Sequence, residues 1–328
     1  MKVLVYGAGV IGSYLCHVLC QAGCEVTLLA RGRWKEVLSK QGLRIFHHLQ
    51  RKETLDHPRI IEGISEAEAY DVVFAVMPYH QMPSILKDLS AVRSPLVVLV
   101  GNNMAPLSMQ QSILDHSPCE KQVLFGFQVT AGKRDFENGR LICERLGKGS
   151  MDLGGLHSLP YERTRKLLSQ CFSGTGYTLH FQPDMEAYLI CHLAAILPIG
   201  YLTYACKGTL LPSTGGQRRC MRLSSREAYG MLKAQGIPIL PEGDEKYYSP
   251  GLRGVLMQLI YFLMAKTTMG DLIACAHCRN AYEEMQLLDE AFTKIMAKTP
   301  DYPLPHWRAL KEQMPSWECV RASYKTPS

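Results

Sequence analysis

The chain has little that would mark it as a specialised or unfolded protein. It has no internal repeat and no low-complexity segment, and 47% of its 328 residues are hydrophobic and 20% are charged. This composition excludes disorder, collagen and a coiled coil as descriptions of the whole chain. Its 36 Lys and Arg exceed its 30 Asp and Glu by only 6. So small a surplus can help to attract an anionic ligand, but without a basic cluster it indicates no nucleic-acid partner.

A second cysteine pair to match Cys275 and Cys278 is missing, so we expect no zinc site and no other metal. The 12 cysteines are scattered, and a chain of this length needs no disulfide scaffold. The first residues, MKVLVYGAG, pass directly into a strand-like run and do not resemble a signal peptide. We therefore expect reduced thiols and a cytoplasmic protein.

One segment, residues 187–206, is nearly all apolar and about as long as a membrane span. It contains His192, Pro198 and Gly200, and charged residues do not bracket it symmetrically. A buried helix of a large helical domain explains the segment equally well. We therefore expect a buried helix in this segment and no membrane partner.

The first half of the chain alternates strand-like and helix-like segments. Its strand-like runs are continuous apolar blocks, which is typical of parallel strands buried on both faces. We expect these strands at 2–6, 25–29, 71–77, 96–100 and 122–127. We expect helices at 10–21, 34–41 and 82–89, and antiparallel strands at 140–144 and 150–153 at the far edge of the sheet. This alternation predicts an α/β fold with a doubly wound parallel sheet of the Rossmann type.

The second half consists of long apolar periodic stretches with few strand signals. We expect helices at 185–205, 218–235, 252–265, 267–298 and 305–314. A length of 328 residues also favours two domains, because single cores rarely grow beyond about 250–300 residues. The predicted domains are residues 1–184, which bind a dinucleotide, and residues 185–328, an all-helical domain for substrate binding or dimerisation.

A glycine-rich turn, Gly7-Ala8-Gly9-Val10-Ile11-Gly12, joins the first strand to the first helix. In such a turn the first glycine permits the tight bend, the second lets the backbone approach a pyrophosphate, and the third lets helix and strand pack closely. The N–H groups at the helix start, including those of Val10 and Ile11, would face the phosphates. The alternative is a glycine turn without a ligand.

An acidic residue is missing at the end of the second strand, where NAD sites usually hold the ribose with an Asp or Glu. The sequence there is LLARGR, with Arg31 and Arg33. Guanidinium groups can hold a 2′-phosphate that a carboxylate would repel. We therefore expect NADP (NADPH) as the cofactor, with Arg31 as the main contact. The alternative is two solvated surface arginines.

The chain resembles the ketopantoate reductase family through GAGVIGSYL at its start, LLARG after the second strand, Gly42-Leu43, and Gly147-Lys148-Gly149. Asn102, in VLVGNNMAP, stands where that family typically has an Asn-Gly pair. The resemblance implies NADPH-dependent reduction of a 2-oxo acid to a 2-hydroxy acid, with Asn102 near the nicotinamide or the substrate. Members of the family are often dimers, so the resemblance leaves a homodimer open.

The resemblance also places the family's catalytic lysine at His192, and its two following asparagines at Ile196 and Gly200. The lysine is thus missing. Met77 replaces a second family lysine, near the adenosine phosphate. A histidine titrates near neutrality and can donate a proton from either nitrogen, so His192 is a candidate acid. It is equally compatible with a histidine buried in a helix.

A late helix supplies the remaining candidates. The family has a serine and a later glutamate there that bind the substrate, and Thr268 and Asn280 fall at these positions. His277, Asn280 and Glu284 are three and four residues apart, so they would share one helix face. We interpret this face as a rebuilt active site, with the solvated side of the helix as the alternative.

The leading hypothesis is an NADPH-dependent reductase of a 2-oxo acid or a related small carbonyl compound. Ketopantoate itself fits poorly, because three polar residues of the family's catalytic helix are replaced. Two alternatives stay open. One is a dehydrogenase for a less polar substrate, since Ile196 and Gly200 would make the site more apolar and roomier. The other is a sensor or binding protein that kept the dinucleotide site and lost the chemistry.

Overall fold

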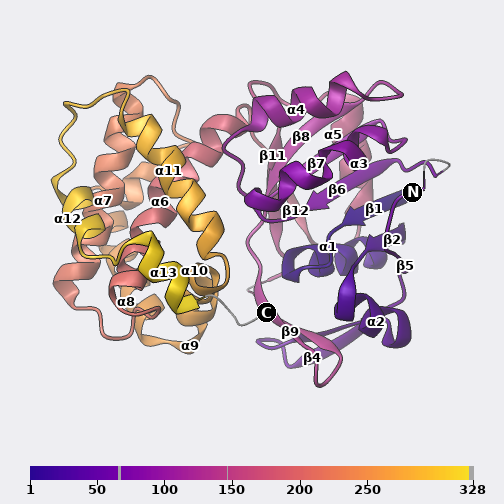
Figure 1. Ribbon diagram of the computed structural model, residues 1–328, viewed down its shortest axis with the longest axis horizontal. Coiled ribbons are helices and arrows are strands. Elements are labelled where there is room, and N and C mark those ends of the chain that lie inside the picture. Colours follow the sequence, from indigo (N-terminus) through magenta and orange to yellow (C-terminus); the bar gives the residue numbers. More distant parts are fainter. Residues whose placement is uncertain (66–67, 146, 325–328) are drawn as a thin grey trace. The chain divides into compact units, whose positions relative to one another are not determined.

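The structure, a computed structural model, describes residues 1–65, 68–145 and 147–324. The chain divides into two compact units, Met1–Met185 and a second unit that begins at Glu186 (Figure 1). The first unit is α/β and the second is helical. The predicted fold class, a Rossmann-type parallel sheet followed by a helical region, is confirmed.

The first unit contains an eight-stranded sheet, in which every neighbouring pair is parallel except β8 with β11. The central strands VVFAV and LVVLV are buried at every position, as expected of strands covered on both faces. In spatial order the strands are β12 (Thr178–Phe181), β11 (Ser150–Gly154), β8 (Gln122–Phe127), β7 (Leu96–Val100), β6 (Val72–Val76), β1 (Lys2–Tyr6), β2 (Glu25–Leu29) and β5 (Arg59–Ile61).

Helices connect these strands, and α3 packs against α4. The helices are α1 (Val10–Gln21), α2 (Gly32–Gln41), α3 (Leu86–Ala91), α4 (Pro106–Asp115) and α5 (Glu162–Cys171). The helix predicted at 82–89 is only partly α-helical, because a 3₁₀ segment, Tyr79–Ile85, occupies its first half. This segment contains Pro83, which has no N–H to donate to an α-helical hydrogen bond.

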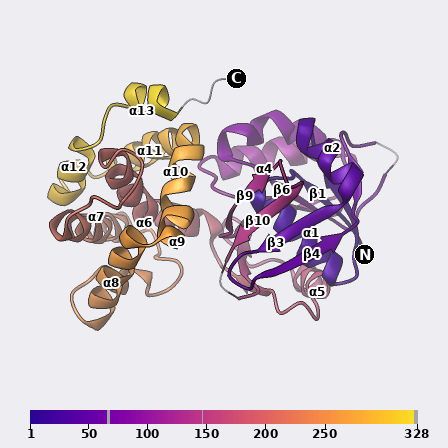
Figure 2. The same cartoon turned by 90° about the horizontal axis from the view of Figure 1, so that it is seen from below.

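A second sheet of four strands lies in the same unit and packs against α1 (Figure 2). Its strands, in order, are β4 (Lys52–Asp56), β3 (Leu43–His47), β10 (Arg140–Glu144) and β9 (Ala131–Asp135). The placement of residues 140–144 at the edge of the main sheet was therefore wrong. Of the two predicted edge strands, only β11 joins the main sheet, antiparallel to β8.

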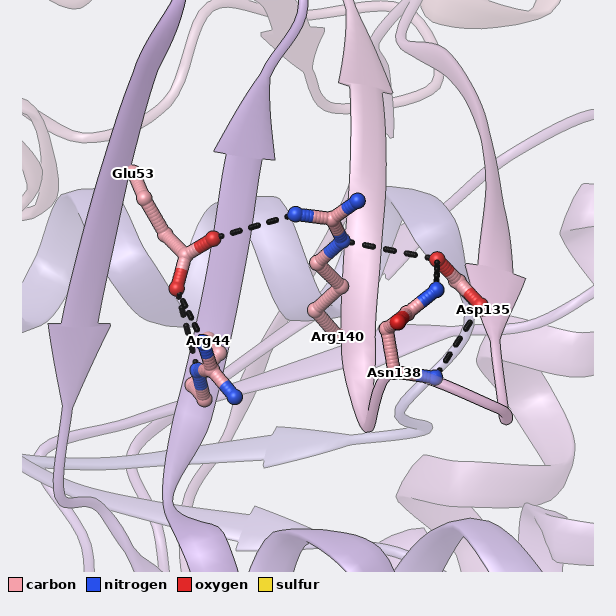
Figure 3. Close-up of polar contacts among 5 residues, drawn as sticks. All are labelled: Arg44, Glu53, Asp135, Asn138 and Arg140. Carbon is pink, nitrogen blue, oxygen red and sulfur yellow. Dashed lines mark hydrogen bonds and ion pairs between the residues drawn. The ribbon is translucent and has the colours of Figure 1, made fainter.

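Charged side chains form a ladder across one face of this second sheet (Figure 3). Glu53 on β4 accepts hydrogen bonds from Arg44 on β3, at 3.0 Å from Nε, and from Arg140 on β10, at 3.3 Å. Arg140 Nε also lies 3.4 Å from Asp135 on β9, and Asn138 in the β9–β10 turn donates to Asp135 at 2.8 Å. The alternating charges favour this strand order over others.

The second unit is built around α6 (Met185–Ala205), which is long and apolar enough to cross a membrane by length and composition. However, 67% of its most apolar window is buried inside the protein, as in the core helix of a folded domain. The other long elements of the unit are α7 (Gly215–Ala234), α8 (Leu252–Lys266), α11 (Tyr282–Met296), α12 (Pro305–Glu312) and α13 (Trp317–Tyr324).

Asp289 on α11 connects four of these helices. Its buried carboxylate accepts hydrogen bonds from Tyr201 Oη on α6 at 2.5 Å, from Lys311 Nζ on α12 at 2.7 Å and from Trp317 Nε1 on α13 at 2.9 Å. Three donors compensate for the desolvation of the buried charge. The Asp289 network is therefore a major determinant of how these helices pack.

The helix predicted over 267–298 is interrupted. It consists of α9 (Thr268–Gly270), a π-helical turn (Asp271–Cys275), α10 (Ala276–Asn280) and α11. The break lies at Ala281, whose φ of −122° and ψ of 33° are not helical. His277, Asn280 and Glu284 thus do not share the face of one helix, and the prediction of a continuous face was wrong.

Candidate functional site

The glycine turn at the end of β1 has the geometry that close packing of a strand, a turn and a helix requires. Gly7 has a φ of +112°, and a Cβ built there would lie 2.3 Å from the carbonyl oxygen of Val76. A Cβ on Gly12 would lie 1.9 Å from the carbonyl oxygen of Gly7. By contrast, none of the described residues has an atom within 4 Å of a Cβ built on Gly9. Two of the glycines are therefore needed for the fold itself, whereas Gly9 borders open space.

The first helix begins directly beside that open space. Gly9 is the N-cap residue of α1, and neither a side-chain cap nor an acidic residue in the first turn is present among the described residues. The N–H groups at the start of a helix have no partner within the helix, and they carry a partial positive charge. The amides of Val10 and Ile11 are consequently available to an anion, and the turn can receive a phosphate without rearranging its backbone.

Arg31 lies immediately after β2 and is the N-cap residue of α2. Its NH2 atom donates to Tyr6 Oη at 2.8 Å, and Tyr6 Oη in turn donates to Asp88 Oδ2 at 2.7 Å. Burial, together with the bond to Asp88, raises the pKa of Tyr6 to about 12. The Arg31 side chain remains 57% exposed, so Tyr6 orients the guanidinium while most of it faces solvent.

Asp88 was not found from the sequence, because it lies on α3 and is brought to Arg31 only by folding. Its Oδ2 atom is 4.0 Å from Arg31 NH2. Arg33, the second predicted arginine, lies instead over the ring of Phe136, with 5.0 Å between its Cζ and the ring centroid. Arg134 lies over the same ring at 5.7 Å. The structure therefore gives the two predicted arginines different neighbours and adds Arg134 beside Arg33.

Asn102 follows β7 at the carboxyl edge of the main sheet. It is preceded by Gly101, whose φ is +135° and whose Cβ, if present, would lie 3.1 Å from the Met77 carbonyl oxygen. Asn102 is buried, and its Oδ1 atom has no hydrogen-bond partner among the described residues. An unsatisfied buried amide oxygen costs free energy unless a ligand or water donates to it. Asn102 therefore fits a residue that contacts a bound molecule.

In the second unit, His192 lies on α6 and is partly buried. Desolvation, together with the charge of His277, lowers the pKa of His192 to about 3. The ring is consequently neutral near pH 7 and carries one N–H. His192 cannot act there as a protonated acid, although a neutral imidazole can still polarise a carbonyl group by donating a hydrogen bond.

His277 and Glu284 approach each other across the break between α10 and α11. His277 Nε2 lies 3.9 Å from Glu284 Oε2, and the two side chains are 46% and 5% exposed, respectively. Glu284 is therefore not on a solvated surface, and it faces an accessible imidazole. Asn280, the last residue of α10, is exposed. The structure thus brings together His277 and Glu284, with His192 close enough to experience the charge of His277.

Gly200 does not open space in the helix, contrary to expectation. A Cβ built on Gly200 would lie 2.5 Å from Met285 Cε and 3.9 Å from Cys278 Sγ. The volume that a larger side chain would need is already occupied by α11 and α10. The roomier site that one of the alternatives assumed is therefore not found at Gly200, because this glycine serves close helix packing. Ile196, one turn earlier on α6, is partly buried.

The described part of the chain does not bring potential metal ligands together. Across residues 1–65, 68–145 and 147–324, no group of three or more His, Cys, Asp or Glu side chains could hold a metal ion. Burial raises the pKa of Cys278 to about 12, and that of Cys275 is raised for the same reason. Both thiols are therefore protonated at neutral pH, which is unfavourable for binding a metal.

Comparison with known proteins agrees with this arrangement. Residues 3–156 match the model of the ketopantoate reductase PanE/ApbA family. An uncharacterised oxidoreductase, YkpB, from Bacillus subtilis is 26% identical over 253 residues, which are 76% of this chain and 80% of that protein.

Two solved structures share the fold over nearly the whole chain, each at 16% sequence identity. A PanE/ApbA family ketopantoate reductase from Ralstonia eutropha aligns with a TM-score of 0.72, covering 99% of this chain and 100% of that one. A D-mandelate dehydrogenase in complex with NADH and anilino(oxo)acetate aligns with a TM-score of 0.74, covering 100% of both chains. The matched residues 3–156 include the glycine turn and Asn102, so this part of the chain is similar to the ketopantoate reductase PanE/ApbA family, and the two solved structures show that the whole chain shares their fold.

Proposed function

We propose that this protein uses NADPH to reduce a 2-oxo acid or a related small carbonyl compound to the hydroxy compound. The observation that carries the proposal is the glycine turn, where Gly9 borders open space at the uncapped start of α1. A turn that served packing alone would need Gly7 and Gly12 but not Gly9. A second observation supports it: the Oδ1 atom of Asn102, which has no partner among the described residues, lies at the same carboxyl edge of the sheet, where ligands bind in folds of this kind.

The preference for NADPH over NADH rests on Arg31. Its guanidinium is oriented by Tyr6 and remains largely exposed, so it can form a forked pair with a 2′-phosphate. Asp88, whose carboxylate lies 4.0 Å from the guanidinium, accepts a hydrogen bond from Tyr6, and Arg31 Nε donates to the backbone carbonyl of Glu62 at 3.5 Å. In our proposal Asp88 and Tyr6 hold Arg31 in place, and the arginine rather than a carboxylate meets the ribose.

When bound, the cofactor supplies a hydride for the carbonyl carbon. The residues of the chain would then have two tasks on the cofactor side. The N–H groups of Val10 and Ile11 would hold the pyrophosphate at the start of α1. The Oδ1 atom of Asn102 would accept a hydrogen bond from the nicotinamide carboxamide or from the substrate, which would satisfy its buried acceptor.

On the substrate side, the two histidines would have different roles. His192, neutral because of its low pKa, would donate its N–H to the carbonyl oxygen and stabilise the negative charge that develops there. His277, which is accessible, would deliver the proton to the alkoxide. Glu284 would act as a positioning residue that orients the imidazole of His277.

A binding protein without turnover is the second candidate function. Its support is the packing of α6, where a position that the family resemblance assigns to a polar asparagine is Gly200, closed off by Met285. Such a change would remove part of a polar substrate site while leaving the nucleotide turn intact. A reductase for a less polar substrate would also tolerate the change, with Ile196 providing apolar contact.

The test is the consumption of NADPH, followed by its absorbance, with 2-oxo acids that increase in size from pyruvate to benzoylformate. NADH is assayed in parallel, and the binding of both cofactors is measured by calorimetry without substrate. We expect turnover with at least one acid and a preference for NADPH. Tight NADPH binding without any turnover would establish the binding protein instead, and an absence of nucleotide binding would refute both functions.

A further inference from the structure

A cavity of about 450 Å³ lies in the second unit, between α7 and α8 (the two helices are labelled in Figure 2). Its size falls in the range of about 300–1,000 Å³ that small-molecule sites usually occupy. None of its lining residues belongs to the nucleotide turn or to the two candidate histidines. The cavity is lined by Gly215, Arg218, Arg219, Arg222, Ser249, Pro250, Gly251, Gly254, Val255, Gln258 and Phe262.

Three cations line this cavity, and none of the described lining residues is acidic. Arg218 is only 7% exposed, and its Nε atom is buried without a hydrogen-bond partner among the described residues. One end of its guanidinium is fixed, because NH1 donates to the carbonyl oxygen of Ser213 and, at 3.0 Å, to Ser213 Oγ. A buried guanidinium with an unused donor requires a compensating acceptor, and nothing in the described lining supplies a charged one.

Arg222 and Arg219 add two further positive charges to the lining of the cavity. Arg222 NH1 donates to the carbonyl oxygens of Tyr248 and Ser249, which holds the guanidinium in place. Burial and the charges of Arg219 and Arg226 lower the pKa of Arg222, as expected where cations accumulate without anions. Arg219 is exposed and lines the cavity. The cluster therefore holds repulsion that an anion would relieve.

The start of α8 adds a second, independent attraction for an anion. This 15-residue helix begins after Gly251, which has a φ of +114°, and neither a side-chain cap nor an acidic first-turn residue occurs in its described part. Gly254 brings the preceding loop close, because a Cβ there would lie 2.0 Å from the carbonyl oxygen of Ser249. The N–H groups at this helix start are thus placed beside the three arginines.

The remaining wall is apolar and holds one unused amide. Phe262 lies beneath Arg218, with 5.5 Å between the guanidinium carbon and the ring centroid, and Val255 is 69% exposed. The Oε1 atom of Gln258 is buried without a hydrogen-bond partner among the described residues. Such a wall suits a ligand whose body is apolar and whose hydrogen-bonding groups are few.

We propose that this cavity is a second ligand site that binds a small organic oxyanion, either a phosphate monoester or a carboxylate, with an apolar body against Val255 and Phe262. Arg218, Arg219 and Arg222 form the charged end of the site together with the start of α8. The proposal does not rest on the function proposed above, since no residue of the cavity belongs to the first unit.

The experiment is calorimetry on the full chain with phenyl phosphate and benzoate, with benzyl alcohol as the neutral analogue, at constant ionic strength set by chloride. We expect saturable binding of at least one of the two anions and none of the alcohol, and the comparison shows which oxyanion is preferred. Arg219→Gln should weaken that binding about tenfold, because it removes one charged donor. Arg308→Gln, at an exposed arginine of α12 outside the cavity, is the matched control and should leave it unchanged.

Val255→Glu is the second variant, because this exposed position can accept a carboxylate that should abolish anion binding without disturbing the core. NADPH affinity is measured in every variant and should not change. The proposal is overturned if neither anion binds, or if Arg308→Gln weakens binding as much as Arg219→Gln does. It is also overturned if NADPH displaces the anion and Arg31→Gln removes its binding, because the anion would then occupy the proposed site of the 2′-phosphate in the first unit.

Discussion

Substitution by alanine should have different effects at two glycines of the turn: at Gly12 it should lower stability, and at Gly9 it should weaken NADPH binding. A Cβ at Gly12 would lie 1.9 Å from the backbone oxygen of Gly7, and backbone atoms cannot move aside as a flexible side chain could. Overpacking of this kind costs about 1–3 kcal/mol or more. For a unit of this size each kcal/mol lowers the melting temperature by about 2–4 °C. Gly12→Ala should therefore lower it by about 2–12 °C.

Gly9→Ala should instead leave stability almost unchanged. The residue has a φ of −70° and a ψ of −172°, which alanine adopts without strain, and its Cβ meets nothing described within 4 Å. The substitution costs about 1 kcal/mol at most, as the difference between glycine and alanine at an N-cap. The new methyl group would nevertheless occupy the space that a pyrophosphate must enter. We expect NADPH affinity to fall by at least ~10-fold, which corresponds to about 1.4 kcal/mol.

Thermal unfolding and calorimetric titration with NADPH, on both variants and the wild type, separate these effects. Only the combination of normal stability with weak binding in Gly9→Ala supports a nucleotide at the turn. Normal NADPH affinity in a stable Gly9→Ala protein would refute the reasoning, because the open space at Gly9 would then have no ligand. A Gly12→Ala protein as stable as the wild type would show that the predicted overlap is relieved by backbone adjustment.

Four further perturbations test other parts of the molecule. Arg31→Gln should raise the KM for NADPH by about 10-fold or more and change that for NADH little, because only NADPH offers a 2′-phosphate; equal changes in steady-state assays with both cofactors would contradict the assignment. His192→Ala should lower kcat by ~100-fold, and by the same factor at every pH from about 5 to 8, because a histidine with a pKa of about 3 stays neutral throughout. If kcat fell only at the acidic or only at the basic end of that range, His192 would be titrating and the assignment would be refuted. Asp289→Ala should destabilise the protein by about 3 kcal/mol, since Tyr201 and two further donors lose a buried acceptor; urea unfolding measures this, and a change below about 1 kcal/mol would be inconsistent with the network. Folding lowers the pKa of His47 to about 4 and that of His192 to about 3, so below about pH 6.5 the unfolded chain binds more protons than the folded protein does. The free energy of unfolding should therefore decrease as the pH falls below that value. His47→Gln should reduce this decrease, which melting curves recorded between about pH 7 and 4 would measure.

The parts of the fold that could be predicted from the sequence are those in which burial is complete. VVFAV and LVVLV are apolar at every position, and both became central strands. The strands β3 and β4 were not predicted, because their sequences LRIFH and KETLD mix charged and apolar residues. Such strands depend on cross-strand pairs, and the partner of β3 comes from residues 140–144, nearly a hundred positions later.

The same distinction applies to the candidate sites. The glycine turn could be recognised because its geometry is encoded within six consecutive residues. Asp88, Tyr6 and Arg134 could not be linked to the arginines after β2, because only the fold brings them together. The sequence around the break at Ala281 contains no glycine or proline that would indicate the end of a helix, so the periodic pattern on either side predicted a single helix.

Whether the second unit performs chemistry or only supports a nucleotide site depends on the burial of Glu284. A carboxylate that is 5% exposed is expensive to desolvate, and a buried ion pair is often less stabilising than apolar residues of similar volume. A binding protein would therefore gain stability by replacing Glu284. The proposed proton transfer gives this costly burial a purpose, because Glu284 lies opposite the accessible ring of His277.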